Sequence, residues 1–175
     1  MKNKIWPLAL LVLASSNSFA EQSCIGKTAT ATFDEFTFDT GVDGKTYHTT
    51  SGLEWARCAV GQTWNNSTSV CEGDAVQLTW QDALLLSESY NLGEHTNWRV
   101  PNLKEMVSLV QRACVNPAID LGVFPAAAVG GYWTSTPNTS ADKTTEAWSV
   151  NFLNGRLESR EKQQDYYIRM VRYAE

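Results

Sequence analysis

The four cysteines of this chain constrain its fold more than any other feature of the sequence. Cys24, Cys58, Cys71 and Cys114 all follow a segment typical of an export signal. In an oxidising compartment an even number of cysteines predicts disulfides, and four cysteines allow three pairings. We favour Cys58–Cys71, which closes a loop rich in Gly, Asn and Ser, together with Cys24–Cys114, which would tie the N-terminal segment to the end of a helix.

The first twenty residues have the pattern of an export signal. Two lysines precede a short apolar run over residues 6–13, and Ser18-Phe19-Ala20 has the small-x-small pattern of a cleavage site. The apolar run is shorter than the about 20 residues that a membrane-spanning helix needs. We therefore expect residues 1–20 to be a signal peptide and residues 21–175 to form a periplasmic or secreted domain, with no membrane insertion after cleavage.

The expected mature chain is acidic. Removing Lys2 and Lys4 from the 14 basic residues leaves 12 against 19 acidic residues, a net charge of −7. Nucleic acid is therefore not an expected partner, because binding to phosphates requires a basic face. The length suits a single domain that buries about two thirds of its unfolded surface.

The hydrophobic pattern predicts strands, then two helices, then strands, an order that indicates an α+β fold. Thr79 and Asn102 are the expected N-caps of the helices, and Glu105 completes a capping box with Asn102. Residues 61–73 are expected to form a polar loop, and Asn154-Gly155 is expected to join a hairpin. The expected strands cover residues 28–38, 45–50, 53–58, 132–136, 147–153, 156–159 and 167–173, and the expected helices cover residues 80–90 and 103–110.

Eight short motifs, most of them built around tryptophan, follow one another along the chain. They are Thr50-Ser51-Gly52-Leu53-Glu54-Trp55-Ala56-Arg57-Cys58, Thr79-Trp80-Gln81-Asp82-Ala83, Trp98-Arg99-Val100-Pro101-Asn102, Pro117-Ala118-Ile119-Asp120, Phe124-Pro125, Tyr132-Trp133-Thr134-Ser135-Thr136, Ala147-Trp148-Ser149-Val150-Asn151-Phe152 and Arg169-Met170-Val171-Arg172. In order and spacing, over residues 40–173, these motifs resemble the Lcl C-terminal domain family, long described as a domain of unknown function.

The resemblance implies a single compact C-type-lectin-like domain, akin to the sulfatase-modifying-factor fold, with two helices, twisted antiparallel sheets and long loops. Members of the family are exported bacterial proteins. The namesake domain ends a collagen-like adhesin and is associated with sulfated glycosaminoglycans. This chain contains no Gly-x-y run, so a collagen stalk is not expected.

The tryptophans can serve either the scaffold or a ligand. Those within expected helices or strands are expected to build the scaffold, because buried tryptophan is commoner than exposed tryptophan there; they are Trp55, Trp80, Trp98, Trp133 and Trp148. Trp64, in a polar loop, is the candidate for an exposed ring that stacks on a sugar. Arg99 could anchor an acidic ligand, but we expect it to stack on an aromatic ring or to pair with Asp120 or Glu105.

Four basic residues are candidate contacts for an anionic polysaccharide. Arg156, Arg160 and Lys162 lie close together after the expected hairpin turn, and Lys143 lies in a nearby loop. Affinity at such a cluster would fall as salt rises. The alternative is a solvated face of mixed charge, because acidic residues are interleaved with the basic ones.

No metal site or other cofactor is expected. Asp34, Glu35, Asp39 and Asp43 offer oxygen atoms for calcium, but there is no EF-hand spacing, and the Glu-Pro-Asn, Gln-Pro-Asp and Trp-Asn-Asp motifs of calcium-binding lectins are absent. Zinc is disfavoured because the sequence has no Cys-x-x-Cys motif and its two histidines are isolated.

Catalytic residues are not predicted either. His48 and His95 lie far in sequence from any nucleophile motif, and Glu54 is a lone carboxylate where a glycosidase needs two. We expect an exported lectin-like binding module, involved in adhesion, that recognises a glycan or an envelope or host surface component. The alternative is a non-catalytic structural or accessory subunit of an envelope or pilus assembly, and an enzyme related to sulfatase-modifying factors is less favoured. The oligomeric state is left open.

Overall fold

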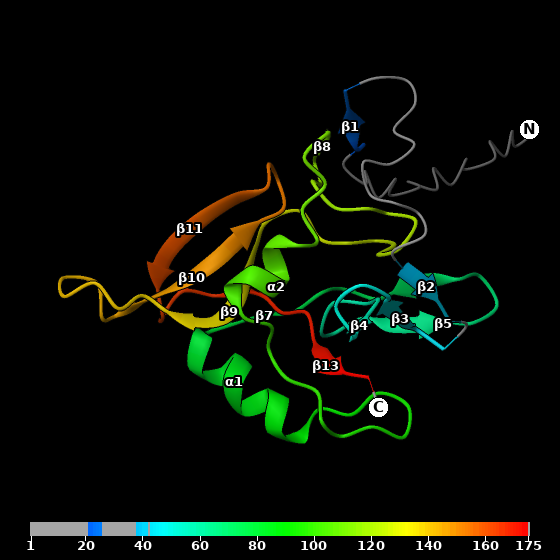
Figure 1. Ribbon diagram of the computed structural model, residues 1–175, viewed down its shortest axis with the longest axis horizontal. Coiled ribbons are helices and arrows are strands. Elements are labelled where there is room, and N and C mark those ends of the chain that lie inside the picture. The colour runs from blue at the N-terminus through cyan, green and yellow to red at the C-terminus, as the bar shows by residue number, and fades with distance from the viewer. Residues whose placement is uncertain (1–20, 26–37, 42, 175) are drawn as a thin grey trace, which may run out of the picture.

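The computed structural model describes residues 21–25, 38–41 and 43–174. The expected signal peptide, nearly all of the strand expected over residues 28–38, and the calcium candidates Asp34 and Glu35 lie outside the described residues. Two helices and mainly antiparallel strands form an α+β domain, as predicted (Figure 1). The elements are β1 (Ser23–Cys24), β2 (Phe38–Thr40), β3 (Lys45–His48), β4 (Leu53–Ala56), β5 (Thr63–Asn65), β6 (Val70–Glu72), β7 (Gln77–Leu78), α1 (Trp80–Ser89), α2 (Leu103–Val107), β8 (Cys114–Val115), β9 (Gly131–Pro137), β10 (Glu146–Asn151), β11 (Arg156–Glu161), β12 (Tyr166–Tyr167) and β13 (Val171–Tyr173).

A five-stranded sheet with the order β11-β10-β9-β12-β7 lies between the two helices. Side chains alternate between its faces, as the pleat requires. Trp133 and Ala147 belong to one core cluster with Ala83 of α1. Tyr132 and Val150 belong to the other core cluster, with Met106 of α2. Each helix therefore covers one face of this sheet.

A four-stranded antiparallel sheet with the order β13-β4-β3-β2 forms the second half of the domain. Leu53, Trp55 and Val171 point into the core from one face, and their neighbours Glu54 and Arg172 lie on the opposite face. The buried residues 168–170 connect β12 of the first sheet to β13 of the second. The single strand predicted over residues 167–173 is therefore divided between two sheets.

The two helices begin where the sequence predicts. The Thr79 hydroxyl accepts a hydrogen bond from the Asp82 N–H at the start of α1. Asn102 and Glu105 form the expected capping box at the start of α2. However, α2 ends at Val107 instead of residue 110, because the N–H groups of the next residues bond to carbonyls three positions back, in the tighter 3₁₀ manner.

Two turns differ from the prediction. The polar loop expected over residues 61–73 is a hairpin of β5 and β6, in which Trp64 pairs with Cys71. The hairpin of β10 and β11 is joined by four residues, 152–155, instead of Asn154-Gly155 alone. The turn still needs glycine, because Gly155 has a φ of 74° and an added Cβ would lie 2.6 Å from Val110 Cγ1.

Both favoured disulfides are confirmed, and the described residues contain no free cysteine. Cys58–Cys71 joins the end of β4 to the β5–β6 hairpin. Cys24–Cys114 joins β1 to its antiparallel partner β8. The expectation that this second bridge holds the end of a helix is wrong, because α2 ends at Val107 and Cys114 lies in a strand.

The scaffold role is confirmed for Trp55, Trp80, Trp98 and Trp133, which belong to the two core clusters, whereas Trp148 belongs to neither. Trp55, Trp98 and Trp133 are buried, and Trp80 and Trp148 are half-buried. The indole N–H groups of Trp80 and Trp133 donate to the carbonyls of Thr134 and Leu78 at 2.8 and 3.0 Å. None of the helices in the described part of the chain has the length and apolar content needed to cross a membrane.

Arg99 has the structural role expected of it. Its two terminal nitrogens donate to the two Glu105 oxygens at 2.8 and 2.7 Å, and the Asn102 N–H donates to the same carboxylate. Burial alone would raise the pKa of Glu105, but the hydrogen bonds from Arg99 and Asn102 outweigh it and hold that pKa below its usual value. Glu105, and not Asp120, is therefore the partner of Arg99.

Replacing each disulfide by a pair of serines tests the contribution of the two closed loops. Cys58–Cys71 closes 13 residues and Cys24–Cys114 closes 90. On a chain-entropy model, their loss lowers the free energy of unfolding by about 3 and about 4–5 kcal/mol respectively. Urea unfolding of the two variants measures the difference. A larger loss for the shorter loop would contradict this ranking, and a free thiol in the unreduced protein would contradict the pairing.

Replacing Glu105 with Gln tests the capping network through its pH dependence. Because the folded-state pKa of Glu105 is lowered, the carboxylate stabilises the fold above its unfolded pKa of about 4.3 and loses this contribution as the pH falls through the folded value. Glu105→Gln should therefore destabilise the protein at pH 7, by about 1–2 kcal/mol, and much less near pH 2. Urea midpoints at both pH values measure this, with exposed Glu88→Gln as control. An equal loss at both values would contradict the role of Glu105.

Candidate functional site

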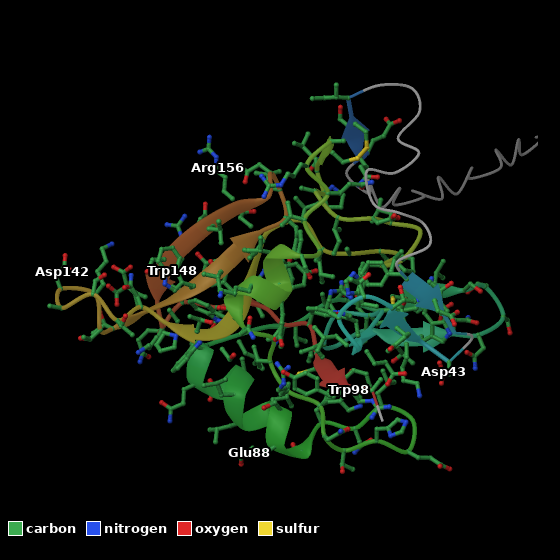
Figure 2. The ribbon with its side chains drawn as sticks, in the orientation of Figure 1. Asp43, Glu88, Trp98, Asp142, Trp148 and Arg156 are labelled. Carbon is green, nitrogen blue, oxygen red and sulfur yellow. A yellow bond between two sulfur atoms is a disulfide. The ribbon has the colours of Figure 1, made fainter. Side chains whose placement is uncertain are left out.

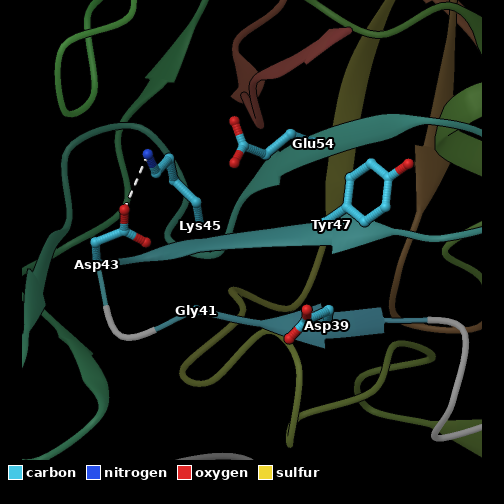
Figure 3. Close-up of a pocket in the computed structure, with 6 residues that line it drawn as sticks. All are labelled: Asp39, Gly41, Asp43, Lys45, Tyr47 and Glu54. Atoms are coloured by element: carbon cyan, nitrogen blue, oxygen red, sulfur yellow. Dashed lines mark ion pairs between the residues drawn. The ribbon is translucent and has the colours of Figure 1, made fainter. Parts of the chain in front are cut away.

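A small cavity of about 260 Å³ lies on the outer face of the four-stranded sheet, the face turned away from the core (Figure 3). Three of its lining residues stand side by side across the sheet, because Asp39 of β2 pairs with Tyr47 of β3, and Tyr47 pairs with Glu54 of β4. Gly41 and Asp43, between β2 and β3, and Lys45 at the start of β3 complete the lining. The lining residues are Asp39, Gly41, Asp43, Lys45, Tyr47 and Glu54.

The charges of this outer-face pocket are partly paired. Lys45 Nζ lies 2.9 Å from an Asp43 oxygen. Glu54 pairs with Arg172, its neighbour on β13, and only 5% of the Arg172 side chain is exposed. Asp39 has no ion pair among the described residues and is exposed to solvent. The pocket therefore offers carboxylate acceptors, ammonium donors and one phenol ring within a small area.

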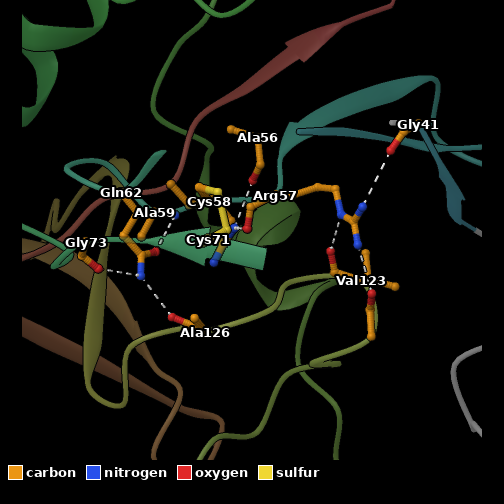
Figure 4. The surroundings of a disulfide bond; sticks show 12 residues. Gly41, Ala56, Arg57, Cys58, Ala59, Gln62, Cys71, Gly73, Val123 and Ala126 are labelled. Carbon is orange, nitrogen blue, oxygen red and sulfur yellow. Dashed lines mark hydrogen bonds between the residues drawn. A yellow bond between two sulfur atoms is a disulfide. The ribbon is translucent and has the colours of Figure 1, made fainter. Parts of the chain in front are cut away.

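Trp64 packs against Gly44, which lies between the pocket residues Asp43 and Lys45. An added Cβ on Gly44 would lie 2.7 Å from Trp64 Cβ, so the indole fills the space beside this turn. The Arg57 guanidinium lies over the Trp64 ring at 4.2 Å. It also donates to the carbonyls of Gly122 and Val123 at 3.0 and 2.8 Å, next to the Cys58–Cys71 disulfide (Figure 4). Trp64 is thus half-buried and packed, where the sequence suggested an exposed ring.

The four basic candidates do not gather in one place. Arg156 begins β11 beside the hairpin turn, whereas Arg160 lies at the other end of the same strand, opposite Ala147. Lys162 and Lys143 lie near Arg160, because the Lys162 N–H and Nζ donate to the carbonyls of Thr145 and Thr144. Figure 2 shows Arg156 and the loop residue Asp142 at opposite ends of the hairpin. Trp64 lies in another sheet altogether.

Most of these basic groups already have partners. Lys143 lies 3.4 Å from Glu146, and Arg160 lies 3.0 Å from Glu158. Lys162 lies over the Trp80 ring at 4.8 Å. Arg156 is the exception, since its side chain forms no ion pair with any described residue. The hairpin therefore carries the mixed-charge face that the interleaved acids suggested.

The described residues hold no group of three histidine, cysteine or acidic side chains arranged to bind a metal ion. Asp39 and Asp43 both line the pocket, but Asp43 pairs with Lys45. An ammonium group competes with a metal ion for the same oxygens, so this pair is not arranged for calcium.

His48 is close to one hydroxyl. Its Nδ1 lies 2.6 Å from Ser51 Oγ within the turn between β3 and β4, and burial lowers the pKa of His48. No carboxylate is hydrogen-bonded to this histidine among the described residues, so the third member of a catalytic triad is missing there. The hydrogen bond between His48 and Ser51 stabilises the turn between β3 and β4.

The sequence does not predict that these residues form a pocket, for a specific reason. The sequence marks Asp39 and Asp43 only as possible calcium ligands, and Glu54 only as a lone carboxylate. Lys45 and Tyr47 carry no motif at all. Their alternation over residues 45–48 is a signal for one outward face, but the strand register that places Tyr47 between two carboxylates comes from long-range pairing.

Comparison with known proteins places the chain in a family. None of the curated proteins compared with it matches. The sequence model of the Lcl C-terminal domain matches residues 44–172, which is most of the chain and includes both large sheets except β2. The matched region contains the buried tryptophans and the pocket residues Lys45, Tyr47 and Glu54. The chain therefore belongs to the Lcl C-terminal domain family.

Proposed function

We propose that this protein is an exported, lectin-like binding module that recognises a saccharide of a cell or envelope surface in its outer-face pocket. The signal-like sequence of residues 1–20 supports export. Two disulfides suit an oxidising compartment such as the periplasm or the medium. Membership of the Lcl C-terminal domain family agrees with an adhesion-related role.

The observation that carries the proposal is the chemistry of the pocket. A saccharide presents hydroxyl groups that both donate and accept hydrogen bonds, and a carbon face that packs on an aromatic ring. Asp39 and Glu54 supply acceptors, Lys45 supplies donors, and Tyr47 between the two carboxylates supplies the ring. The volume of about 260 Å³ lies below the about 300–1,000 Å³ of sites for drug-sized ligands, so we expect one sugar ring to enter.

The pocket is better suited to binding than to catalysis. Its lining includes no serine, cysteine or histidine, and so no nucleophile with an adjacent base. Glu54 is held by Arg172 and Asp43 by Lys45, which leaves Asp39 as the carboxylate without an ion pair. A glycosidase requires two carboxyl groups with different protonation states on either side of the bond. Binding without turnover is therefore the proposed activity.

Saccharide binding can be tested with an array of surface glycans, followed by calorimetry of any hit. We expect Asp39→Asn and Tyr47→Ala each to weaken binding at least tenfold, since one removes a charged acceptor and the other removes the stacking ring. The matched controls are Asp142→Asn, in a distant loop, and Tyr173→Ala, on the other face of the sheet. Both controls should bind as the unmodified protein does.

Three other outcomes would count against this proposal. An anionic polysaccharide that requires Arg156, Arg160, Lys143 or Lys162, and binds more weakly as salt rises, would move the site to the hairpin. No saccharide binding, together with co-purification of an envelope or pilus protein, would favour the structural or accessory role. Hydrolysis of the bound saccharide would show an enzyme.

A further inference from the structure

We propose that β11 is a self-pairing edge, at which two copies of this chain join antiparallel around Leu157 and extend the five-stranded sheet into a continuous sheet of two copies. The inference is independent of the proposed saccharide site. It rests on the backbone of β11, on one exposed leucine and on the order of charges along the strand.

The backbone of β11 has hydrogen-bonding groups that no described strand satisfies. Among the described strands, β11 lies at the edge of its sheet and pairs with β10 alone. The Lys162 N–H donates to the Thr145 carbonyl in the same register as the β10–β11 pairs. Since hydrogen-bonded and non-bonded pairs alternate in an antiparallel ladder, the N–H and C=O groups of Leu157 and Ser159 point away from β10, as does the N–H of Glu161. The Glu161 carbonyl accepts a hydrogen bond from the Gln164 N–H in the following turn.

Two side chains at the start of β11 are also exposed to solvent. Leu157 is 49% exposed, although it is a large apolar side chain within a strand. Arg156 is exposed and forms no ion pair with the described residues (Figure 2). Exposed edges of this kind are templates for pairing with another chain.

A register centred on Leu157 satisfies the backbone groups of that residue and both exposed side chains together. When Leu157 faces Leu157 of a second copy, the two residues exchange both backbone hydrogen bonds and cover each other's side chains. Arg156 of each copy then lies directly opposite Glu158 of the other. Both residues of each pair lie on the same face, so two intermolecular ion pairs form across the junction.

The neighbouring registers are opposed by like charges. Pairing centred on Glu158 would place Glu158 against itself and Arg156 against Arg160. Pairing centred on Ser159 would place Glu158 opposite Arg160, but it would also place Arg156 against Lys162 and Leu157 against Glu161. Charged edge residues usually prevent pairing, but of these three alignments the one centred on Leu157 pairs opposite charges without opposing like ones.

The contact is small, and the dimer is therefore expected to be weak. It involves about five residues from each copy, where a stable interface has about 20–30 a side. We expect association that depends on protein concentration. Analytical ultracentrifugation of the exported chain with both disulfides formed measures it. A dimer would carry two outer-face pockets, which increases avidity for a repetitive surface.

Charge reversal tests the pairing and its register. Arg156→Glu and Glu158→Arg should each raise the dimer dissociation constant at least tenfold, and the double variant should restore it, because the complementary pairs are exchanged. Arg160→Glu makes the same charge change on the same strand and should have little effect on dimerisation. Weakening by Arg160→Glu without weakening by Arg156→Glu would overturn this register in favour of one centred on Ser159. A protein that stays monomeric to about 1 mM would overturn the dimer itself.

Crosslinking provides a second measurement that does not depend on these ion pairs. Facing Leu157 residues would have Cα atoms about 5.5 Å apart, within the range that a disulfide spans. Leu157→Cys should therefore form a covalent dimer under mild oxidation, and Ser159→Cys, which faces Gly155 in this register, should not. Equal crosslinking of both variants would contradict a fixed register.

Discussion

The fully buried guanidinium of Arg169 connects the parts of this domain. Arg169 has no solvent exposure, and its Nη1 donates to the carbonyls of Ala56 and Arg57 at 2.8 and 2.6 Å. The group lies over the rings of Phe124 and Tyr132 at 4.5 and 5.7 Å. No carboxylate pairs with it among the described residues, and its Nε and Nη2 have no acceptor there. Burial lowers the pKa of Arg169, yet an arginine in such a site keeps its proton.

The position of Arg169 explains how a buried charge, whose desolvation is unfavourable, can still stabilise the fold. It lies in the 168–170 connection between the two large sheets, and its hydrogen bonds reach the end of β4 just before the Cys58–Cys71 disulfide. Arg57, the next residue, lies over the Trp64 ring, and Trp64 packs against Gly44 beside the outer-face pocket. A charge that binds only backbone carbonyls and aromatic faces can fix the angle between two sheets without a partner side chain. The scaffold and the proposed binding surface are thus separate: tryptophans and arginines build the first, and outward strand residues form the second.

The sequence predicted those features that local signals determine. Thr79 and Asn102 begin the helices because their side chains cap N–H groups within the next turn. The disulfides followed from cysteine count and spacing. No local signal marks Arg169 as buried, because its burial depends on rings and carbonyls distant in the sequence. The meeting of Asp39 with Glu54 across Tyr47 depends likewise on the register of three strands, which no single segment encodes.

The direct test of the central role of Arg169 is the free energy of unfolding of Arg169→Met, measured in urea at neutral pH beside Arg169→Lys. Methionine keeps much of the volume but leaves the two carbonyls without this donor, and lysine keeps the charge but loses the planar stacking. We expect Arg169→Met to lose about 2–4 kcal/mol and Arg169→Lys to lose a smaller but clear amount. Removing the buried charge also removes its desolvation cost, and this gain opposes the expected loss of stability. An Arg169→Met protein as stable as the original would show that the interactions of Arg169 do not outweigh that cost, and would contradict its central role.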